Sequence, residues 1–345
     1  MKGTTMNTSR RTVAAAAAGA LALTLSACVK TSEEAAESAG TSGSAKGSAT
    51  TLYNDPEAEP NLDLPANPRV VALGWSDGEI AVSLGVKPVA IYDWMAFGAK
   101  TKGVGSWASD KFGDSKPKII SAQSAGKFNY QQIKELKPDV ILNVRGASDD
   151  KVQRSLRKIA PVVAAPKGAP DFAVNWKTQT TLIGKALGKG QDATKLVSQT
   201  TGAQDKIKKD HPEFAGKTFV YGAKFGEAYG AYTEGDARFD TFATLGFTQN
   251  PPVEQLKSSG FFAAVPTEKV KSLDAEVAIL TTIGKPLSEL KSDKSINSLG
   301  VVRDDRAVML DGMDPSMQAM SAGTPLSLQF ALKELTPKLS AAAKK

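Results

Sequence analysis

The sequence has 345 residues but only one cysteine and one histidine, Cys28 and His211. One cysteine cannot form an intrachain disulfide framework, and one histidine is too few for a zinc, manganese or copper site built from several histidines. We therefore expect no metal site of the protein's own: a metal that it handles binds through oxygen atoms or arrives enclosed in another ligand. The formal charge of +7 is partly due to Lys2, Arg10 and Arg11, and the modest excess elsewhere gives no support for nucleic-acid binding.

Motifs of several enzyme classes are also absent. The sequence has no Gly-x-x-x-x-Gly-Lys-Ser/Thr loop, which binds the phosphates of a nucleoside triphosphate. The first expected strand is followed by Leu73-Gly74-Trp75-Ser76-Asp77-Gly78 and not by a dinucleotide-binding glycine pattern. His211 would have to serve any Ser-His-Asp triad, but it stands beside Pro212 at the end of an expected helix, where a solvated imidazole is typical. We expect a protein that is not an enzyme, although carboxylate-pair chemistry stays open at this point.

The N-terminus has the pattern of an export signal. Residues 1–12 are polar and basic, and Val13 begins an unbroken run of small apolar residues that ends at Ala27. Fifteen residues are too few to span a bilayer, so 1–27 is predicted to be a signal peptide. Leu25-Ser26-Ala27-Cys28 resembles a lipobox, which implies lipidation of Cys28; an incidental cysteine after an ordinary signal peptide is the alternative. Ser9-Arg10-Arg11 fits twin-arginine export but does not exclude the general secretory route.

The segment 28–60 is predicted to be the lipidated cysteine followed by a flexible tether. It consists mainly of Ser, Gly, Ala, Thr, Glu and Asp and has almost no side chain to bury. Such a tether would hold a soluble body at the extracytoplasmic face of the cell membrane without embedding it there. The kind of cell envelope is not decided by these residues.

Beyond the tether, short apolar runs alternate with helical patterns, which is typical of an α/β structure with parallel strands. We expect a first lobe over 61–190, one amphipathic helix over 191–211, and a second lobe over 212–345. Strands are expected at 69–73, 89–91, 140–142, 162–164, 218–221, 277–280 and 307–310. Helices are expected at 77–84, 129–136, 149–159, 192–209, 239–245, 267–273 and 326–335. Segments 130–142 and 267–279 resemble each other at a constant offset of 137 residues, which favours a duplicated lobe; chance similarity of two helix-to-strand units is the alternative.

Aromatic and basic residues follow the ends of several expected strands, where α/β sheets bind ligands. Flat aromatic walls with a few cations suit a large, partly anionic ligand that is desolvated between two lobes. The candidate ligand-binding residues are Trp75, Tyr92, Trp94, Trp107, Arg145, Tyr221, Tyr229, Arg238 and Met313, with Tyr232 and Met317 beside them. Each also has a structural alternative, because a tryptophan after a strand is often part of a core and an arginine is often a solvated cap.

The span from Pro68 to about Pro337 resembles the substrate-binding proteins of ABC importers for ferric siderophores and cobalamin. The resemblance is carried by several short pieces in combination: 69–73, Leu84-Gly85-Val86-Lys87-Pro88-Val89, Ile133 to Leu142 with Leu136-Lys137-Pro138-Asp139, Lys158-Ile159-Ala160-Pro161-Val162, Ile183 to Lys189, and Leu245-Gly246-Phe247. It implies two Rossmann-like lobes joined by a single long helix, the helical-backbone clamshell of class III periplasmic binding proteins.

The resemblance also implies a function. A monomeric lipoprotein would capture a ferric siderophore between its lobes and deliver it to the dimeric permease of an ABC transporter. Iron would be bound by the siderophore's oxygens, so no cofactor of the protein's own is expected. Arg145 and Arg238 would compensate ligand oxygens, and aromatic residues would cover the organic scaffold. The siderophore's chemical type is not decided by these residues.

In this family a glutamate on each lobe docks onto permease arginines. Glu268 matches the position on the second lobe, whereas the first-lobe position is occupied by Gln131, with Glu135 one helical turn away as a substitute. A solvated helix surface is the alternative for all three. A cobalamin or haem receptor of the same fold remains the second interpretation, and an extracytoplasmic enzyme or adhesion lipoprotein the third.

Overall fold

The structure, a computed structural model, describes residues 51–121 and 126–345, which all belong to one compact unit of the chain. The expected signal peptide, Cys28 and most of the expected tether lie outside the described residues. No helix within the described ranges is long and apolar enough to cross a membrane.

The first lobe contains an all-parallel sheet with strand order β1-β6-β5-β2-β3-β4. Its strands are β1 (Leu52–Tyr53), β2 (Val70–Ala72), β3 (Ala90–Tyr92), β4 (Lys118–Ile120), β5 (Val140–Asn143) and β6 (Val162–Ala164). Its helices are α1 (Asp77–Ser83), α2 (Ser106–Ser109), α3 (Tyr130–Glu135), α4 (Asp150–Arg157) and α5 (Trp176–Ala186), with 3-10 turns η1 (Ala99–Thr101) and η2 (Asp110–Phe112). Strands β2, β5 and β6 are buried along their whole lengths, as expected for a parallel sheet covered on both faces.

Two apolar clusters cover the two faces of this sheet. Ile80 of α1 and Leu182 of α5 pack on one face, whereas Ile133 of α3 and Leu156 of α4 pack on the other. Helices α3, α4 and α5 begin at side-chain caps; at the start of α3 the side chain of Asn129 accepts a hydrogen bond from the amide of Gln132. The strand and helix alternation expected from the sequence is therefore confirmed in this lobe.

The beginning of the described chain differs from the expected tether. Leu52 and Tyr53 form β1, which pairs in parallel with Val162 and Val163 of β6 at the edge of the sheet. The Tyr53 ring is buried in the same cluster as α1 and α5, and its hydroxyl donates to the carbonyl of Ala58. The expectation of a flexible tether is therefore wrong for these residues, because one large ring in a polar segment is enough to attach it to a sheet edge.

The second lobe contains a mixed sheet with order β10-β11-β8-β7-β12-β13, and β9 pairs with β7. Its strands are β7 (Thr218–Phe225), β8 (Ala228–Tyr232), β9 (Thr248–Gln249), β10 (Ser258–Ser259), β11 (Phe262–Val265), β12 (Val277–Thr282) and β13 (Ala307–Leu310). Its helices are α7 (Ala237–Thr244), α8 (Pro251–Glu254), α9 (Leu287–Lys291), α10 (Lys294–Asn297), α11 (Gly300–Arg303), α12 (Pro315–Ala322) and α13 (Pro325–Ala343), with 3-10 turns η3 (Pro212–Phe214) and η4 (Thr267–Leu273). The hairpin of β7 and β8 extends the expected strand at 218–221 by four residues and adds an antiparallel neighbour.

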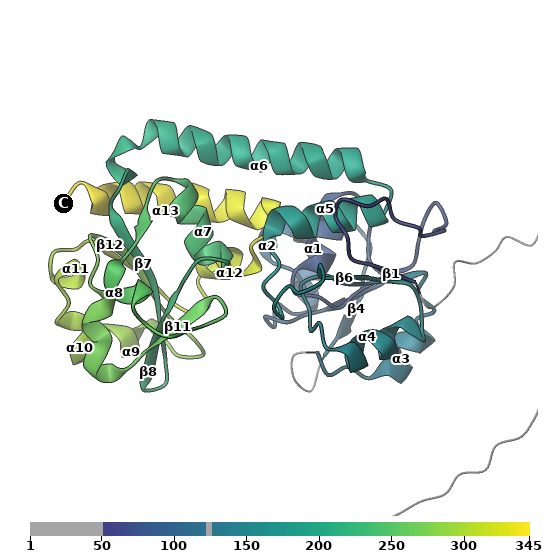
Figure 1. Ribbon diagram of the computed structural model, residues 1–345, viewed down its shortest axis with the longest axis horizontal. Coiled ribbons are helices and arrows are strands. Elements are labelled where there is room, and N and C mark those ends of the chain that lie inside the picture. The colour runs from purple at the N-terminus through teal and green to yellow at the C-terminus, as the bar shows by residue number, and fades with distance from the viewer. Residues whose placement is uncertain (1–50, 122–125) are drawn as a thin grey trace, which may run out of the picture. The chain divides into compact units, whose positions relative to one another are not determined.

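The lobes are connected by α6 (Gly190–Asp210), close to the expected 191–211. Its 21 residues span about 31 Å. It packs against α5 of the first lobe and against α7 and α13 of the second, and Figure 1 shows α6 and α13 running side by side. Pro337 stands inside α13, which continues well beyond the expected end at 335.

The expected similarity between segments 130–142 and 267–279 is found in their strands more than in their helices. Val140 and Val277, 137 residues apart, each begin a strand that lies between two parallel neighbours. The preceding segments differ, because Tyr130–Glu135 is α-helical whereas Thr267–Leu273 is a 3-10 helix.

Candidate ligand-binding site

Three aromatic rings of the first lobe stack together near the carboxyl ends of its strands. Trp75 follows β2 and Trp94 follows β3, and their ring centroids lie 4.4 Å apart at an interplanar angle of 8°. The ring of Phe172 stacks on Trp75 at 4.4 Å as well. All three rings are partly exposed, whereas the indole nitrogen of Trp75 is buried and has no hydrogen-bond partner among the described residues. The stack is an aromatic surface of the kind that binds a flat or apolar ligand.

Arg145 connects this aromatic stack to the second lobe. Its guanidinium lies 5.8 Å from the Trp75 ring and 6.0 Å from the Trp94 ring. Its Nε donates to the carbonyl of Phe172 at 3.0 Å, and Nη1 donates to the carbonyls of Ser321 and Ala322 in the second lobe at 3.1 and 2.8 Å. The side chain is only 5% exposed, and burial lowers the pKa of Arg145 to about 10.

Asp77, at the start of α1, fixes the backbone of Arg145. Its carboxylate accepts hydrogen bonds from the amides of Val144 and Arg145 at 2.8 and 3.3 Å, and from the Gln179 side chain at 2.7 Å. Burial raises the pKa of Asp77 to about 6. A Cβ atom at Gly74 would lie 2.2 Å from Asp77 Oδ2, so glycine is needed for this turn.

Glu79, also on α1, contacts the second lobe directly. Its Oε1 accepts a hydrogen bond from Trp107 Nε1 at 2.6 Å and another from the hydroxyl of Thr324, the N-cap residue of α13. The side chain is 2% exposed, and burial raises the pKa of Glu79 to about 7. Trp107, predicted as a ligand contact, is therefore placed as a structural partner of Glu79, and its ring packs against Phe330 of α13.

On the second lobe, Arg238 forms an ion pair with Asp236. Arg238 Nε and Nη2 donate to the two carboxylate oxygens of Asp236, each at 2.7 Å. The guanidinium also lies 3.6 Å from the centre of the Tyr232 ring, and Nη1 reaches the hydroxyl of Ser321 at 3.4 Å. Because Ser321 also binds Arg145, the two arginines meet at the end of α12.

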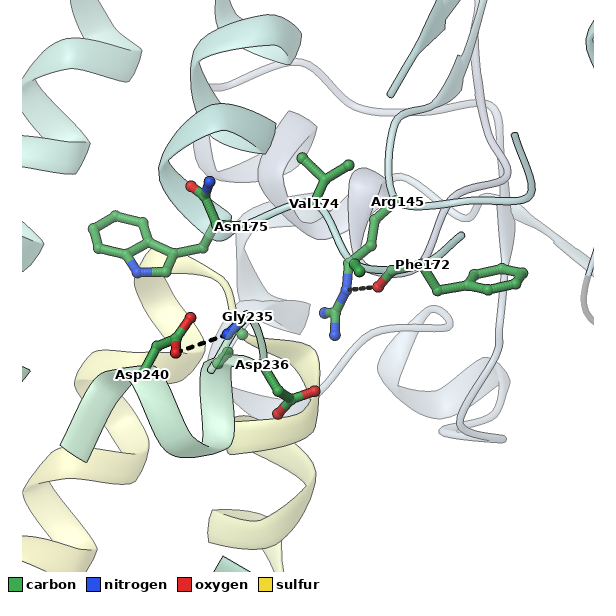
Figure 2. Close-up of a pocket in the computed structure, with 11 residues that line it drawn as sticks. Arg145, Phe172, Val174, Asn175, Gly235, Asp236 and Asp240 are labelled. Atoms are coloured by element: carbon green, nitrogen blue, oxygen red, sulfur yellow. Dashed lines mark hydrogen bonds between the residues drawn. The ribbon is translucent and has the colours of Figure 1, made fainter. Parts of the chain in front are cut away.

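A small cavity lies between the lobes at this point. Arg145, Phe172 and Trp176 line it from the first lobe, and Asp236 and Asp240 from the second; Figure 2 shows Arg145 and Asp236 facing the same space. The cavity volume is about 20 Å³, room for about one water molecule. A large ligand therefore needs the lobes to separate or the aromatic stack to open.

The structure brings together Trp75, Trp94, Arg145 and Arg238, and it places the other candidates apart. Tyr221 is fully buried behind Tyr232, with ring centroids 5.6 Å apart, so it supports the cluster from within the core. Tyr92 packs edge-on against Phe128 and lines a cavity of about 10 Å³ beside Trp94. Met313 is 66% exposed after β13.

Tyr229 belongs to a different pocket. Its hydroxyl donates to Asp293 at 2.6 Å, and Asp293 also forms an ion pair with Lys224. The pocket around them has a volume of about 450 Å³ and includes Thr267, the neighbour of Glu268. Glu268, Gln131 and Glu135 are exposed, and the Gln131 side chain donates to Glu135 at 3.2 Å.

Sequence reasoning missed Asp77, Glu79, Phe172 and Asp236. Asp77 and Glu79 lie in the first turn of α1, where acids are common for helix-dipole reasons, so their burial gives no sequence signal. Asp236 stands two residues before Arg238, a spacing that could have indicated the ion pair. No group of three or more His, Cys, Asp or Glu side chains in the described ranges could hold a metal ion.

Comparisons with known proteins agree with this architecture. Residues 70–307 match the family model described as periplasmic binding protein. A periplasmic solute binding protein from Mycobacterium smegmatis is 27% identical, with a TM-score of 0.70 over 80% of this chain and 93% of that one. The iron uptake ABC transporter substrate-binding protein PiaA from Streptococcus pneumoniae is 25% identical, with a TM-score of 0.65 over 81% of this chain and 96% of that one.

A further structure has a similar fold at lower identity. Staphylococcus aureus SirA complexed with staphyloferrin B is 22% identical, with a TM-score of 0.65 over 83% of this chain and 97% of that one. Among curated proteins, a search found no match to this sequence. Because the family model covers more than half of the chain, and the two-lobe fold with its connecting helix agrees with it, the chain belongs to the periplasmic binding protein family.

Proposed function

We propose that the protein is an extracytoplasmic receptor that binds a ferric siderophore between its lobes and delivers it to an ABC permease for iron uptake. The observation that carries this proposal is the cluster in which the Trp75–Trp94 stack of one lobe meets Arg238 of the other through Arg145. A siderophore presents an organic scaffold around an iron that its own oxygens enclose. It needs an apolar surface and few hydrogen-bonding groups, and no metal ligands from the protein.

The similar structures support this ligand class. PiaA is named for iron uptake, and SirA was solved with staphyloferrin B. The site itself agrees, because it combines aromatic rings with arginines.

The proposed delivery step uses the lipid anchor and the docking residues. Lipidation of Cys28, which lies outside the described residues, would hold the body near the membrane. Glu268 would contact permease arginines from the second lobe, and the pair of Gln131 and Glu135 would contact the permease from the first. Exposure of these three side chains supports this assignment.

Tryptophan fluorescence tests the proposed ligand class. The full chain, with Cys28→Ser to prevent lipidation, is titrated with ferrichrome, ferric staphyloferrin B, haem and cobalamin, and each iron-free siderophore serves as a control. We expect saturable quenching by a ferric siderophore, because the ligand contacts Trp75 or Trp94. Quenching by haem or cobalamin alone would instead support the alternative receptor, and no response to any ligand would contradict the proposal.

A further inference from the structure

The charges between the lobes are balanced by the protein itself. Two cations, Arg145 and Arg238, lie beside three buried carboxylates, Asp77, Glu79 and Asp236. Even with Glu79 partly protonated near neutral pH, these groups carry no net positive charge. An anionic ligand would therefore find no uncompensated cation among them.

The guanidinium of Arg238 already has a carboxylate partner. Both of its paired donors are used on Asp236, the geometry in which guanidinium binds a carboxylate most strongly. The Tyr232 ring lies against the guanidinium at 3.6 Å. Asp236 is 3% exposed, and its side chain also accepts a hydrogen bond from the Arg238 amide as the N-cap of α7. A ligand anion would have to displace a buried carboxylate that belongs to the fold.

Arg145 donates to main-chain carbonyls and not to a carboxylate of the described residues. Three of its donor hydrogens point at the carbonyls of Phe172, Ser321 and Ala322. Taking these donors for a ligand would leave the two carbonyls at the end of α12 without this partner. The partly buried Asp240, which lines the same cavity, adds another carboxyl group.

The largest exposed side chains beside Arg145 are aromatic rings. Trp75, Trp94 and Phe172 are partly exposed, and the rings of Trp75 and Trp94 lie within about 6 Å of the Arg145 guanidinium. An uncharged complex matches these rings without a large desolvation penalty, whereas a multiply charged anion would lose its hydration with little compensation.

We infer that the ligand is an uncharged ferric complex of the trihydroxamate class, and that Asp236 sets this preference by neutralising Arg238. This inference rests on the proposed function and narrows its ligand. Three singly charged hydroxamates cancel the charge of Fe³⁺, whereas three doubly charged catecholates, or a set of carboxylates in excess, leave a net negative charge.

The test compares affinities by fluorescence titration at fixed ionic strength. The ligands are ferrichrome, which is uncharged, ferric staphyloferrin B and a synthetic ferric tris-catecholate, which are anionic. Asp236→Asn removes the charge but keeps an N-cap oxygen for α7, and Asp236→Ser does the same with a smaller side chain. Asp149→Asn is the matched control, because Asp149 also caps a helix, α4, but is exposed.

We expect the wild type to bind ferrichrome at least tenfold more tightly than either anionic complex, and Asp236→Asn to shift this ratio at least fivefold toward the anions. The control should leave the ratio unchanged. Tighter binding of an anionic complex by the wild type would overturn the inference while the proposed function stands. An unchanged ratio in both folded Asp236 variants would remove Asp236 as the selective residue. Failure of every ferric complex to bind would overturn the proposed function and this inference together.

Discussion

Arg145 of the first lobe donates a hydrogen bond of 2.8 Å from Nη1 to the carbonyl oxygen of Ala322 in the second lobe. Ala322 is the last residue of α12, and Gly323 follows it in the left-handed region at a φ of 58°. The carbonyls at such a helix end have no partner within the helix, and the helix dipole makes this end negative. A buried guanidinium is therefore a suitable cap, and it connects the lobes.

Replacing this cap should destabilise the fold. We expect Arg145→Met to lower the free energy of unfolding by about 2 to 4 kcal/mol, because charge-assisted hydrogen bonds to buried carbonyls are lost. Urea denaturation measures the change. Arg154→Met is the control, since the Arg154 side chain is 61% exposed in its pair with Asp150 and should change stability by less than about 0.5 kcal/mol. An Arg145 variant with wild-type stability and impaired siderophore affinity would instead identify Arg145 as a ligand contact.

Stability should depend on pH through Glu79 and Asp77. Burial raises the pKa of Glu79 from 4.5 to about 7 and that of Asp77 from 3.8 to about 6. Between about pH 4 and 7 these two carboxyl groups therefore bind more protons in the folded protein than in the unfolded chain, so their contribution to the free energy of unfolding falls as the pH rises through this window. Glu79→Gln keeps an oxygen that accepts from Trp107 and Thr324, and it should remove up to about 3 kcal/mol of this pH dependence.

Urea denaturation of wild type and Glu79→Gln from pH 4 to 8 measures this difference. Glu254→Gln, at an exposed position, should keep the wild-type slope. An equal slope for Glu79→Gln and wild type would show that the carboxyl titrates at its ordinary pKa in the folded protein.

The strand β1 should contribute to the stability of the first lobe. A protein without residues 1–60 should have a lower midpoint of thermal unfolding than one without residues 1–50, because the Tyr53 ring and its pairing with β6 are lost. Tyr53→Ala in the full chain should cost about 2 to 4 kcal/mol, and Leu52→Ala, at a more exposed position, should cost less. Equal melting of both truncated proteins would contradict the role of β1.

The aromatic stack should contribute directly to ligand affinity. We expect Trp94→Ala to weaken siderophore binding at least tenfold and to remove much of the fluorescence quenching, because the stacking surface beside Trp75 is lost. Trp107→Phe is the comparison: Trp107 hydrogen-bonds to Glu79, so its loss should lower stability more than affinity. If Trp94→Ala binds as tightly as the wild type, the stack is not the ligand surface.

Delivery to the permease should be separable from binding. Glu268→Arg is expected to abolish uptake of radioactive iron by cells while leaving siderophore affinity unchanged, because an exposed docking carboxylate is replaced by a cation. Glu254→Arg, another exposed glutamate on the second lobe, should support normal uptake. Normal uptake by Glu268→Arg would exclude Glu268 from docking.

The sequence is sufficient to predict the elements whose pattern is local. The strand at 162–164 is found with the same ends, and the inter-lobe helix differs from its predicted range by one residue at each end, because both depend on runs of apolar residues at regular spacing. The hairpin of β7 and β8 is harder to predict from the sequence, since Gly222 and Gly230 interrupt the pattern of side chains along its strands. The attachment of Tyr53 depends on a partner strand more than a hundred residues away.

The site is less predictable than the fold for a related reason. Position after a strand end is sufficient to find Trp75, Trp94 and Arg145, because parallel strands bring their ends together. It cannot distinguish an arginine that meets a ligand from one that caps a distant helix, as Arg145 caps α12. Asp236, the partner of Arg238, and Thr324, the partner of Glu79, are identified as members of the site only from the three-dimensional structure.

The position of iron in a crystal of the protein with ferrichrome tests the account most directly. Anomalous scattering locates the iron without reference to the protein coordinates. We predict a single iron between the lobes, with the siderophore in contact with Trp75 or Trp94 and with the Arg238–Asp236 pair. Iron bound in the pocket of Lys224, Tyr229 and Asp293, or on the outer surface of either lobe, would contradict the account.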